Sequence, residues 1–181
     1  MIYTTKELLK LGETEYSIRN RVKSHTLYLV ERGLYSTEPD EIARTEAYIS
    51  KKYPFAIFTG LSAFFIYGLT DYIPNNFDLA TEQHSFPIRR KDVKQSYQDK
   101  AFFQIGVVSK QLDEGVIKIY DLERLLIELF RLREKYPPEI YYEVLTSFRK
   151  IKNSIDFYKL NIYAKNFSNG ANLLLRIKEA L

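Results

Sequence analysis

The chain has 181 residues, 45% of them hydrophobic and 28% charged, which excludes a disordered or low-complexity polymer. It is long enough for one domain, or for a small module joined to a domain of about 140 residues. Cysteine is absent, which excludes disulfides and thiol chemistry, and the two widely spaced histidines, His25 and His84, argue against a zinc site. Because the sequence shows no secretory leader and no uncharged run of 18 residues, we expect a cytoplasmic protein that does not span a membrane.

The first predicted element is a short helix that begins after Thr4. Thr4 and Glu7 have the Ser/Thr-x-x-Glu spacing of a capping box, in which the hydroxyl accepts a hydrogen bond from the backbone and the glutamate reaches back. Leu8, Leu9 and Leu11 form the side of this helix that we expect to be buried.

A second helix is predicted over residues 15–24. Gly12 can adopt the left-handed conformation that ends a helix, and Thr14 can cap the next helix two residues later. Ile18 and Val22 lie one turn apart and indicate the buried face. The two helices therefore form a tight helix-turn-helix corner.

The other face of this second helix is polar and basic. It presents Tyr16, Arg19, Asn20 and Lys23, whose side chains include donors long enough to reach base edges and phosphates. We interpret these four residues as DNA-binding candidates. The alternative interpretation is a solvent-exposed polar face without a ligand.

A β-hairpin is predicted next, with strands over residues 27–30 and 34–36. Arg32 and Gly33 lie in its turn, where glycine supplies the positive φ angle and the arginine is a further DNA-binding candidate. The block of residues 1–40 is neutral, with six cations against six carboxylates. The order helix, turn, helix, hairpin nevertheless favours a winged helix-turn-helix that binds DNA.

Two later stretches, residues 86–111 and 147–165, are also basic and offer a possible surface for a partner or nucleic acid. The plain alternative for each is a solvated face. The candidate residues are Arg89, Arg90, Lys91, Lys94, Arg149, Lys150 and Lys152.

The remaining chain predicts a mixed body in which strands precede helices, so the expected fold class is α+β. We place the domain boundary between residues 38 and 39, with a DNA-binding unit at 1–38 and an α+β domain at 39–181. Expected helices cover residues 41–52, 55–69, 156–167 and 170–181, with one more that is capped by Asp121 and stopped at Pro137-Pro138 and another that starts there and buries residues 140–148. Expected strands cover 77–81, 101–108 and 116–120, the last two as an antiparallel pair.

A search for catalytic chemistry finds no phosphate-binding glycine loop, metal-ligand set or nucleophile elbow. Ser62 is expected to cap or line a helix. Asp121, Glu123 and Arg124 could form an ionic site, but an aspartate that caps a helix with an acid in the first turn is the simpler interpretation. We therefore expect no enzymatic activity and no cofactor.

Several short segments, in the same order, resemble the AbiEi-type antitoxins of bacterial abortive-infection systems. In the first 36 residues they are Thr4 to Leu9, Ser17-Ile18 with Val22, Leu27, and Arg32 to Tyr35. Farther along the chain they are Ser62-Ala63, Tyr67-Gly68-Leu69, Tyr120 to Leu126, and Ile155-Asp156 with Leu160, Tyr163, Ala164 and Lys165.

This resemblance implies a transcriptional repressor whose N-terminal winged helix binds operator repeats. The DNA-binding face that it implies consists of Tyr16, Ser17, Arg19, Asn20 and Lys23, with Arg32 in the wing. It also implies a C-terminal domain that counteracts a nucleotidyltransferase-like toxin in phage defence, in a type IV system where direct contact between the two proteins is not required. The sequence departs from the family pattern in four places: no helix precedes Thr4, Ser24-His25 replace a basic residue and glycine, Tyr67 replaces histidine, and Leu126 or its neighbour replaces threonine. We therefore expect a winged helix that lacks its usual first helix.

Two classes of function stay open. In one, the chain is an antitoxin that represses its own operon by binding double-stranded DNA. In the other, the N-terminal unit is a degenerate module for protein interaction, or the chain is an orphan transcriptional regulator.

Overall fold

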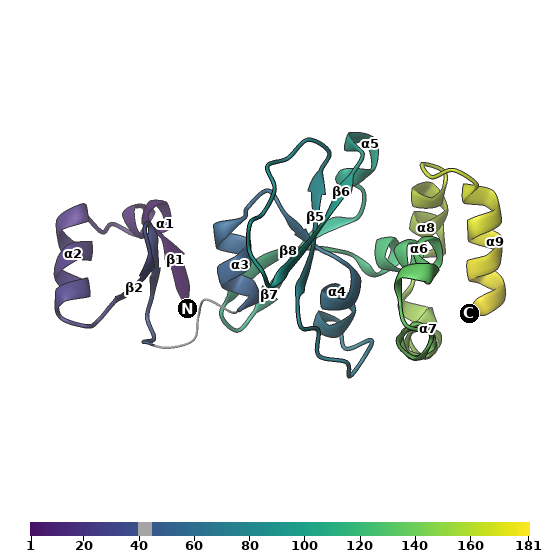
Figure 1. Ribbon diagram of the computed structural model, residues 1–181, viewed down its shortest axis with the longest axis horizontal. Helices are drawn as coiled ribbons and strands as arrows, with labels where there is room; N and C mark the ends of the chain where they lie inside the picture. Colours follow the sequence, from purple (N-terminus) through teal and green to yellow (C-terminus); the bar gives the residue numbers. More distant parts are fainter. Residues whose placement is uncertain (40–44) are drawn as a thin grey trace. The chain divides into compact units, whose positions relative to one another are not determined.

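The computed structural model describes residues 1–39 and 45–181 and shows an α+β protein (Figure 1). The chain divides into two compact units. Unit 1 comprises Met1–Phe55 and Ser109–Lys118, and unit 2 comprises Ala56–Val108 and Ile119–Leu181.

Unit 1 begins with two short helices and a small antiparallel sheet whose strand order is β1-β3-β2. Strand β1 is too short to be recognised in the sequence, but Ile2 pairs with Ser36 and extends the predicted hairpin to three strands. The elements are β1 (Ile2–Thr4), α1 (Thr5–Lys10), α2 (Glu15–Lys23), β2 (Tyr28–Glu31) and β3 (Leu34–Ser36).

These elements enclose a core built on Leu8, Ile18 and Leu27, which are at most 3% exposed. The prediction that Leu9 and Leu11 are also buried is wrong, because they are 44% and 68% exposed. Helix α1 has only six residues, so a single leucine on it reaches the core. A core this small leaves the stability of the N-terminal elements dependent on their neighbours.

Helix α3 (Glu46–Lys52) supplies two ion pairs to these elements. Lys51 pairs with Glu7 of α1, and Lys52 Nζ lies 2.5 Å from Glu31 Oε2 of β2. The helix was expected to begin near residue 41; residues 40–44 lie outside the described part of the chain. In the structure, Thr45 caps α3 by accepting a hydrogen bond from the Tyr48 backbone N–H.

A second sheet has the strand order β6-β5-β4-β8-β7. Strand β5 is antiparallel to β4 and parallel to β6, and β4 is parallel to β8. β7 and β8 are adjacent and joined by two residues, as expected for an antiparallel hairpin. The bounds are β4 (Ile57–Phe58), β5 (Phe77–Glu82), β6 (Val93–Gln98), β7 (Val107–Leu112) and β8 (Gly115–Tyr120).

Three segments around this sheet differ from the prediction. The apolar run over residues 55–69 is not one helix, because it contains β4 before helix α4 (Gly60–Ile66). Residues 101–108 are not one strand, because Asp99 caps the short helix α5 (Lys100–Phe103) by accepting a hydrogen bond from the Ala101 backbone. Strand β6 was missed, since its polar sequence shows no buried face.

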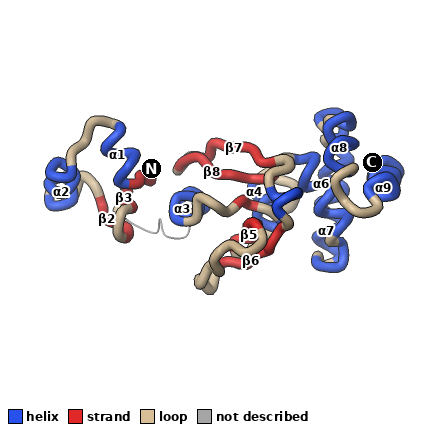
Figure 2. The backbone as a smooth tube through the Cα atoms, turned by 90° about the horizontal axis from the view of Figure 1, so that it is seen from above, coloured by secondary structure: helices blue, strands red, loops and turns tan. Residues whose placement is uncertain are grey.

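Helices α6 to α9 gather beside one another within unit 2 (Figure 2). Their predicted apolar stripes are confirmed for α6, where Leu125, Leu126 and Leu129 are fully buried, and for α7, where Val144 and Phe148 are. The bounds are α6 (Leu122–Arg131), α7 (Pro138–Lys150), α8 (Phe157–Ala164) and α9 (Gly170–Ala180). Within the described ranges, no helix is long and apolar enough to cross a membrane.

Candidate nucleic-acid interface

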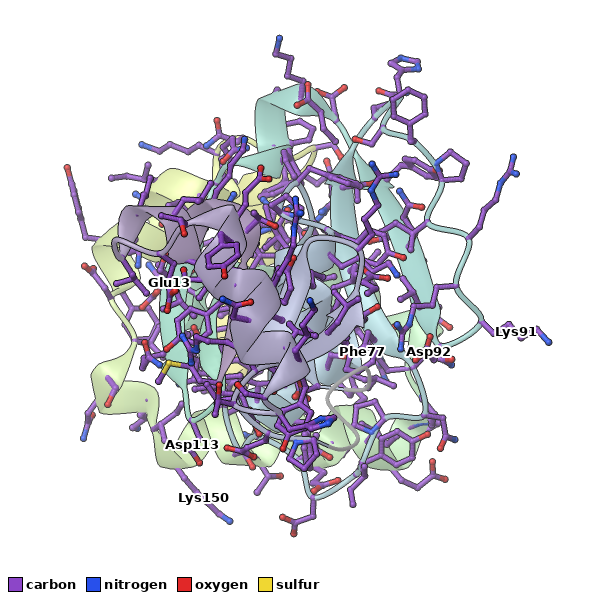
Figure 3. The ribbon with its side chains drawn as sticks, turned by 90° about the vertical axis from the view of Figure 1, so that its left-hand side faces the viewer. Glu13, Phe77, Lys91, Asp92, Asp113 and Lys150 are labelled. Atoms are coloured by element: carbon purple, nitrogen blue, oxygen red, sulfur yellow. The ribbon has the colours of Figure 1, made fainter. Side chains whose placement is uncertain are left out.

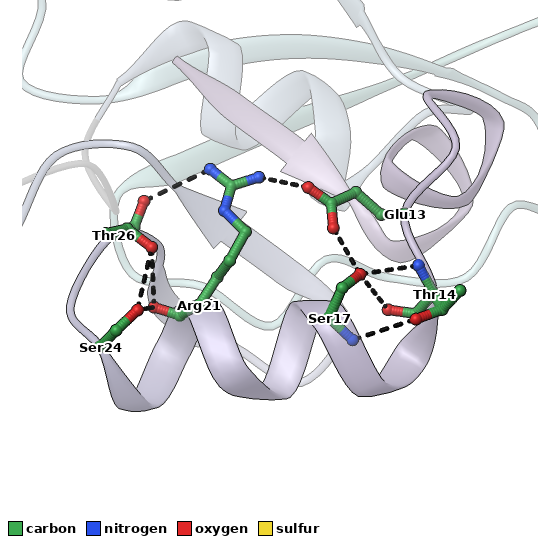
Figure 4. Close-up of polar contacts among 6 residues, drawn as sticks. All are labelled: Glu13, Thr14, Ser17, Arg21, Ser24 and Thr26. Atoms are coloured by element: carbon green, nitrogen blue, oxygen red, sulfur yellow. Dashed lines mark hydrogen bonds and ion pairs between the residues drawn. The ribbon is translucent and has the colours of Figure 1, made fainter.

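Helix α2 is fixed at its first turn by side-chain hydrogen bonds (Figure 4). Thr14 Oγ1 accepts from the Ser17 backbone N–H at 3.1 Å, and Ser17 Oγ accepts from the Thr14 backbone N–H at 2.8 Å, which completes a capping box. Ser17 also donates to Glu13 at 2.5 Å. The hydroxyl of Ser17, one of the predicted DNA-binding residues, is therefore engaged in starting the helix.

Arg21, one of the four cations of residues 16–33 that a DNA groove was expected to meet, makes hydrogen bonds beyond both ends of α2 (Figure 4). Its Nη1 lies 2.6 Å from Glu13 Oε1, and its Nη2 donates to the Thr26 carbonyl at 3.4 Å. Hydrogen bonds from Ser17 and Arg21 hold the pKa of Glu13 below its usual value. Arg21 thus holds the helix in place, and its guanidinium is already engaged by Glu13 and the Thr26 carbonyl.

The other four predicted residues on α2 lie along one exposed stripe. Tyr16 is 75% exposed, and the Arg19 side chain is 74% exposed. Asn20 and Lys23 are exposed one turn farther on, at the i+4 and i+7 positions from Tyr16. We call Tyr16, Arg19, Asn20 and Lys23 the α2 stripe.

The α2 stripe is free to exchange its present contacts for a ligand. Arg19 pairs with Glu15 at 3.3 Å, but both side chains are more than 70% exposed, and such a pair stabilises a helix by about 0.3–0.5 kcal/mol. Lys23 forms no ion pair within residues 1–39 and 45–181. Arg32 is exposed in the turn between β2 and β3, where Gly33 has a φ of +84°.

The first basic stretch lies on the connection that returns from β5 to the parallel strand β6. Gln95 anchors this connection by accepting from the Ile88 backbone N–H at 2.8 Å. Arg90 makes two hydrogen bonds to Asp92, at 2.5 and 2.7 Å, and its side chain is 18% exposed. Among the candidates here, Arg89 and Lys91 are the exposed ones on the loop, and Figure 3 shows Lys91 extending away from the ribbon.

Lys94 lies on β6 and lines a cavity that is described below, whereas Arg89 and Lys91 do not line it.

The second basic stretch falls at the end of α7 and just beyond it. Arg149 Nε donates to the Ala180 carbonyl at 2.7 Å, so it holds the end of α9. Lys150 and Lys152 are exposed, and Lys150 extends outward (Figure 3). The structure therefore does not assemble these candidates into one continuous set of free cations.

The predicted ionic residues of α6 serve the fold. Asp121 caps α6, as expected, and its Oδ2 also accepts from the Tyr163 hydroxyl at 3.0 Å and lies 2.8 Å from Lys159 Nζ. Glu123 accepts from the Asp156 backbone N–H at 2.9 Å and lies 3.1 Å from the same lysine. Burial alone would lower the pKa of Lys159, but hydrogen bonds to both carboxylates raise it. This network ties α6 to α8.

Arg124 completes the cluster from a fully buried position, which the sequence did not predict. Its side chain is 0% exposed, with Nη2 2.8 Å from Glu128 Oε1 and Nη1 donating to the Phe102 carbonyl at 2.8 Å. The guanidinium also lies 4.6 Å from the ring centroid of Tyr120 and 4.7 Å from that of Phe167. Every side of the cation is thereby occupied by protein.

Ser62 lines helix α4, as predicted, and is buried. Its hydroxyl donates to the Asn76 carbonyl at 3.1 Å and accepts from the Asp78 backbone N–H at 2.8 Å. It therefore connects α4 to the start of β5 and is not exposed as a nucleophile would be.

The α2 stripe and Arg32 are thus the predicted residues that remain exposed within one small unit, on helix and turn positions held by local caps. A scan of the chain against models of known protein families gives no match, and a search of curated proteins gives no significant match.

Proposed function

We propose that unit 1 binds double-stranded DNA through the α2 stripe, with the Arg32 turn as the wing. We also propose that the chain is an antitoxin that represses its own operon and counteracts a nucleotidyltransferase-like toxin. The observation that carries the DNA-binding part is the exposure of four polar or basic side chains along one face of a capped helix, beside a small antiparallel sheet.

The chemistry of the α2 stripe fits a major groove. Arginine pairs in bidentate fashion with guanine and asparagine with adenine, while lysine and the tyrosine hydroxyl reach phosphates. The ion pair between Glu15 and Arg19 is no obstacle, because an exposed pair is worth less than about 1 kcal/mol and phosphate replaces the carboxylate.

The small number of cations sets the expected salt dependence. If Arg19, Lys23 and Arg32 each contact one phosphate, the slope of log K against log salt is about −3. We expect specific binding at low salt that weakens steeply as salt rises, with a dimer or repeated sites compensating for the few contacts of one unit.

The test is a fluorescence anisotropy titration of the full chain against the duplex upstream of its own gene. The double variant Arg19→Ala/Lys23→Ala should bind about 10- to 100-fold more weakly and lower the salt slope by up to about 2. The matched control is Lys6→Ala/Lys10→Ala, which removes the same charge from exposed positions of α1. Unchanged affinity in the α2 variant, or an equal loss in the control, would refute the assignment of the interface.

The antitoxin part rests on the order of the short segments that resemble AbiEi-type antitoxins. Its test is co-expression with the neighbouring reading frame of a nucleotidyltransferase-like protein. The full chain should relieve growth arrest, and Arg19→Ala/Lys23→Ala should keep this rescue while losing repression of a reporter driven by its own promoter. No rescue by the unmodified chain would reject the antitoxin assignment and leave an orphan regulator.

One observation favours a second candidate function, a protein-interaction role for unit 1. Leu9 on α1 and Leu11 at the end of that helix, both expected in the core, are instead exposed. If this face binds a protein, Leu9→Ser/Leu11→Ser should abolish rescue or repression without weakening DNA binding. The same anisotropy and reporter measurements therefore separate the two candidates.

A further inference from the structure

A cavity of about 380 Å³ opens in unit 2 between the sheet and the end of α6. One wall is formed by β6 and the start of β5, where the parallel register places Asp78 beside Lys94. The opposite wall is formed by the last turn of α6 and the 3-10 helix η2 (Arg133–Lys135). This volume lies near the lower end of the range of about 300–1,000 Å³ that accommodates small ligands, so a dinucleotide would not fit.

Cations from three different elements converge on the cavity: Lys94 from β6, Arg131 from α6 and Lys135 from η2. In the described part of the chain, Lys94 and Lys135 make no ion pair or hydrogen bond with another residue. Arg131 is held in place by Glu128 at 3.2 Å and by the ring of Phe167, whose centroid is 4.2 Å away. The three charges therefore lack a sufficient counter-ion of their own.

The two carboxylates in the lining, Asp78 and Glu128, compensate these three cations only in part. Glu128 Oε1 lies 2.8 Å from the fully buried Arg124, which neutralises it before Arg131 is counted. Asp78 accepts a hydrogen bond from the Leu61 backbone N–H at 2.8 Å; burial raises the pKa of its carboxyl, whereas this hydrogen bond and the charge of Lys94 act to lower it. The three cations of the lining therefore face two carboxylates, one of which is paired with Arg124. The cavity is thus positively charged.

Two hydroxyl groups in the lining also lack protein partners. Thr59 is only 9% exposed and precedes α4, but its side chain makes no capping hydrogen bond and none to any other described residue. The Tyr136 ring packs edge-on against Phe64, with centroids 5.5 Å apart, while its hydroxyl has no hydrogen-bond partner among the described residues. Since no buried side-chain polar atom of the described residues lacks a partner, both hydroxyls are reached by solvent in the cavity and are available to a polar ligand.

We propose that this cavity binds a phosphomonoester no larger than a mononucleotide. Lys94, Arg131 and Lys135 hold the phosphate, whose charge of about −1.5 to −2 matches three cations better than a carboxylate does. Thr59 and Tyr136 make hydrogen bonds to the rest of the ligand. The proposal does not depend on DNA binding, since every lining residue belongs to unit 2.

The test is an NMR titration of the full chain with AMP, ribose 5-phosphate, inorganic phosphate and adenosine at constant ionic strength. AMP or ribose 5-phosphate should saturate with a Kd below about 1 mM and shift the backbone amides of residues 59–61 and 94–98. Adenosine and inorganic phosphate should each bind at least about 10-fold more weakly, because each lacks half of the recognised group. Equal affinity for inorganic phosphate would overturn the proposal that Thr59 and Tyr136 recognise the organic group of the phosphomonoester.

Charge reversal at two nearby lysines provides a matched pair of variants. Lys94→Glu should weaken binding at least about 10-fold, whereas Lys91→Glu, which makes the same change on the loop where the side chain extends outward, should leave the affinity unchanged (Figure 3). Equal weakening by both would show a diffuse charge effect and overturn the assignment of the cavity.

A conservative variant guards against loss of folding. Thr59→Val keeps the shape of the side chain and the extended backbone, with φ −146°, but removes the hydroxyl, so it should weaken binding several-fold with an otherwise unchanged spectrum. Absence of any shift at millimolar AMP and ribose 5-phosphate, or shifts confined to residues 14–36, would reject the site.

Discussion

Helices α2 and α6 each contain an arginine and a glutamate four residues apart, but the two pairs lie in opposite environments. Arg19 and Glu15 are 3.3 Å apart with more than 70% of each side chain exposed. Arg124 and Glu128 are 2.8 Å apart and at most 2% exposed. Sequence spacing predicts that both pairs can form, whereas burial decides whether the arginine is available to a ligand or is part of the core.

The difference in burial also sets the energetic role of each pair. Water screens the α2 pair, so breaking it costs little and the arginine can move to a phosphate. The α6 pair has exchanged water for protein partners, so removal of one member leaves the other charge unsatisfied. The charges of α2 are therefore suited to binding, and those of α6 to holding the helices of unit 2 in register.

Replacement of the buried arginine should have the largest effect. Arg124→Met should lower the free energy of unfolding by about 3–5 kcal/mol, because it leaves Glu128 buried with Arg131 as its remaining partner. Arg19→Met, the same change on the exposed pair, should alter it by less than about 0.5 kcal/mol. Urea unfolding of the full chain measures both, and similar losses in the two variants would contradict the comparison.

The small core of unit 1 should give the next largest effect. Leu8→Ala truncates one of the three residues of the Leu8, Ile18 and Leu27 core cluster and should destabilise the N-terminal elements by at least about 2 kcal/mol. Leu11→Ala, at a site 68% exposed, should change their stability by less than about 0.5 kcal/mol. Amide hydrogen exchange over residues 1–36 measures this local stability, and equal protection in the two variants would show that the core is elsewhere.

The smallest expected effect concerns Glu7. Burial opposes its ionisation, but hydrogen bonds from Lys51 and Thr4 hold the pKa of the Glu7 carboxyl below its ordinary value of 4.5. Since the folded pKa is the lower one, ionised Glu7 stabilises the fold above about pH 4.5, and this contribution is lost as the pH falls through the folded pKa. Acidification should therefore loosen the N-terminal elements.

Lys51→Met should raise the pKa of Glu7 and reduce this pH dependence. Lys6→Met removes the same charge from an exposed position of α1 and should leave the pKa unchanged. An NMR titration of the Glu7 carboxyl distinguishes them. A Glu7 pKa that does not respond to Lys51→Met would show that the ion pair does not hold α3 to α1 in solution.

The sequence predicted those parts of the fold that depend on contacts within one or two turns. The caps at Thr4, Thr14 and Asp121 and the apolar stripes of α6 and α7 are confirmed, because each is determined by neighbouring residues. Strand β6 could not be predicted, since its polar residues form a strand through pairing with β5, and β1 depends on residues at least 30 positions away.

The candidate sites follow the same division. Exposure of the α2 stripe was predictable from its helical spacing. The burial of Arg124 and the cavity beside Lys94, in contrast, combine residues from separate elements. Thr59, Arg131 and Lys135 had no sequence signal as a group, because they come from three segments that only the sheet and α6 bring together.

The two ion pairs from α3 bear on how the module that we propose to bind DNA can be transferred to another protein. A fusion that ends the module at residue 38, after the last strand of the small sheet, would separate Glu7 and Glu31 from Lys51 and Lys52. Both carboxylates would then add uncompensated negative charge to a module meant to approach a polyanion. A transferred segment should therefore extend through Lys52, so that it includes helix α3, whose two lysines neutralise these carboxylates.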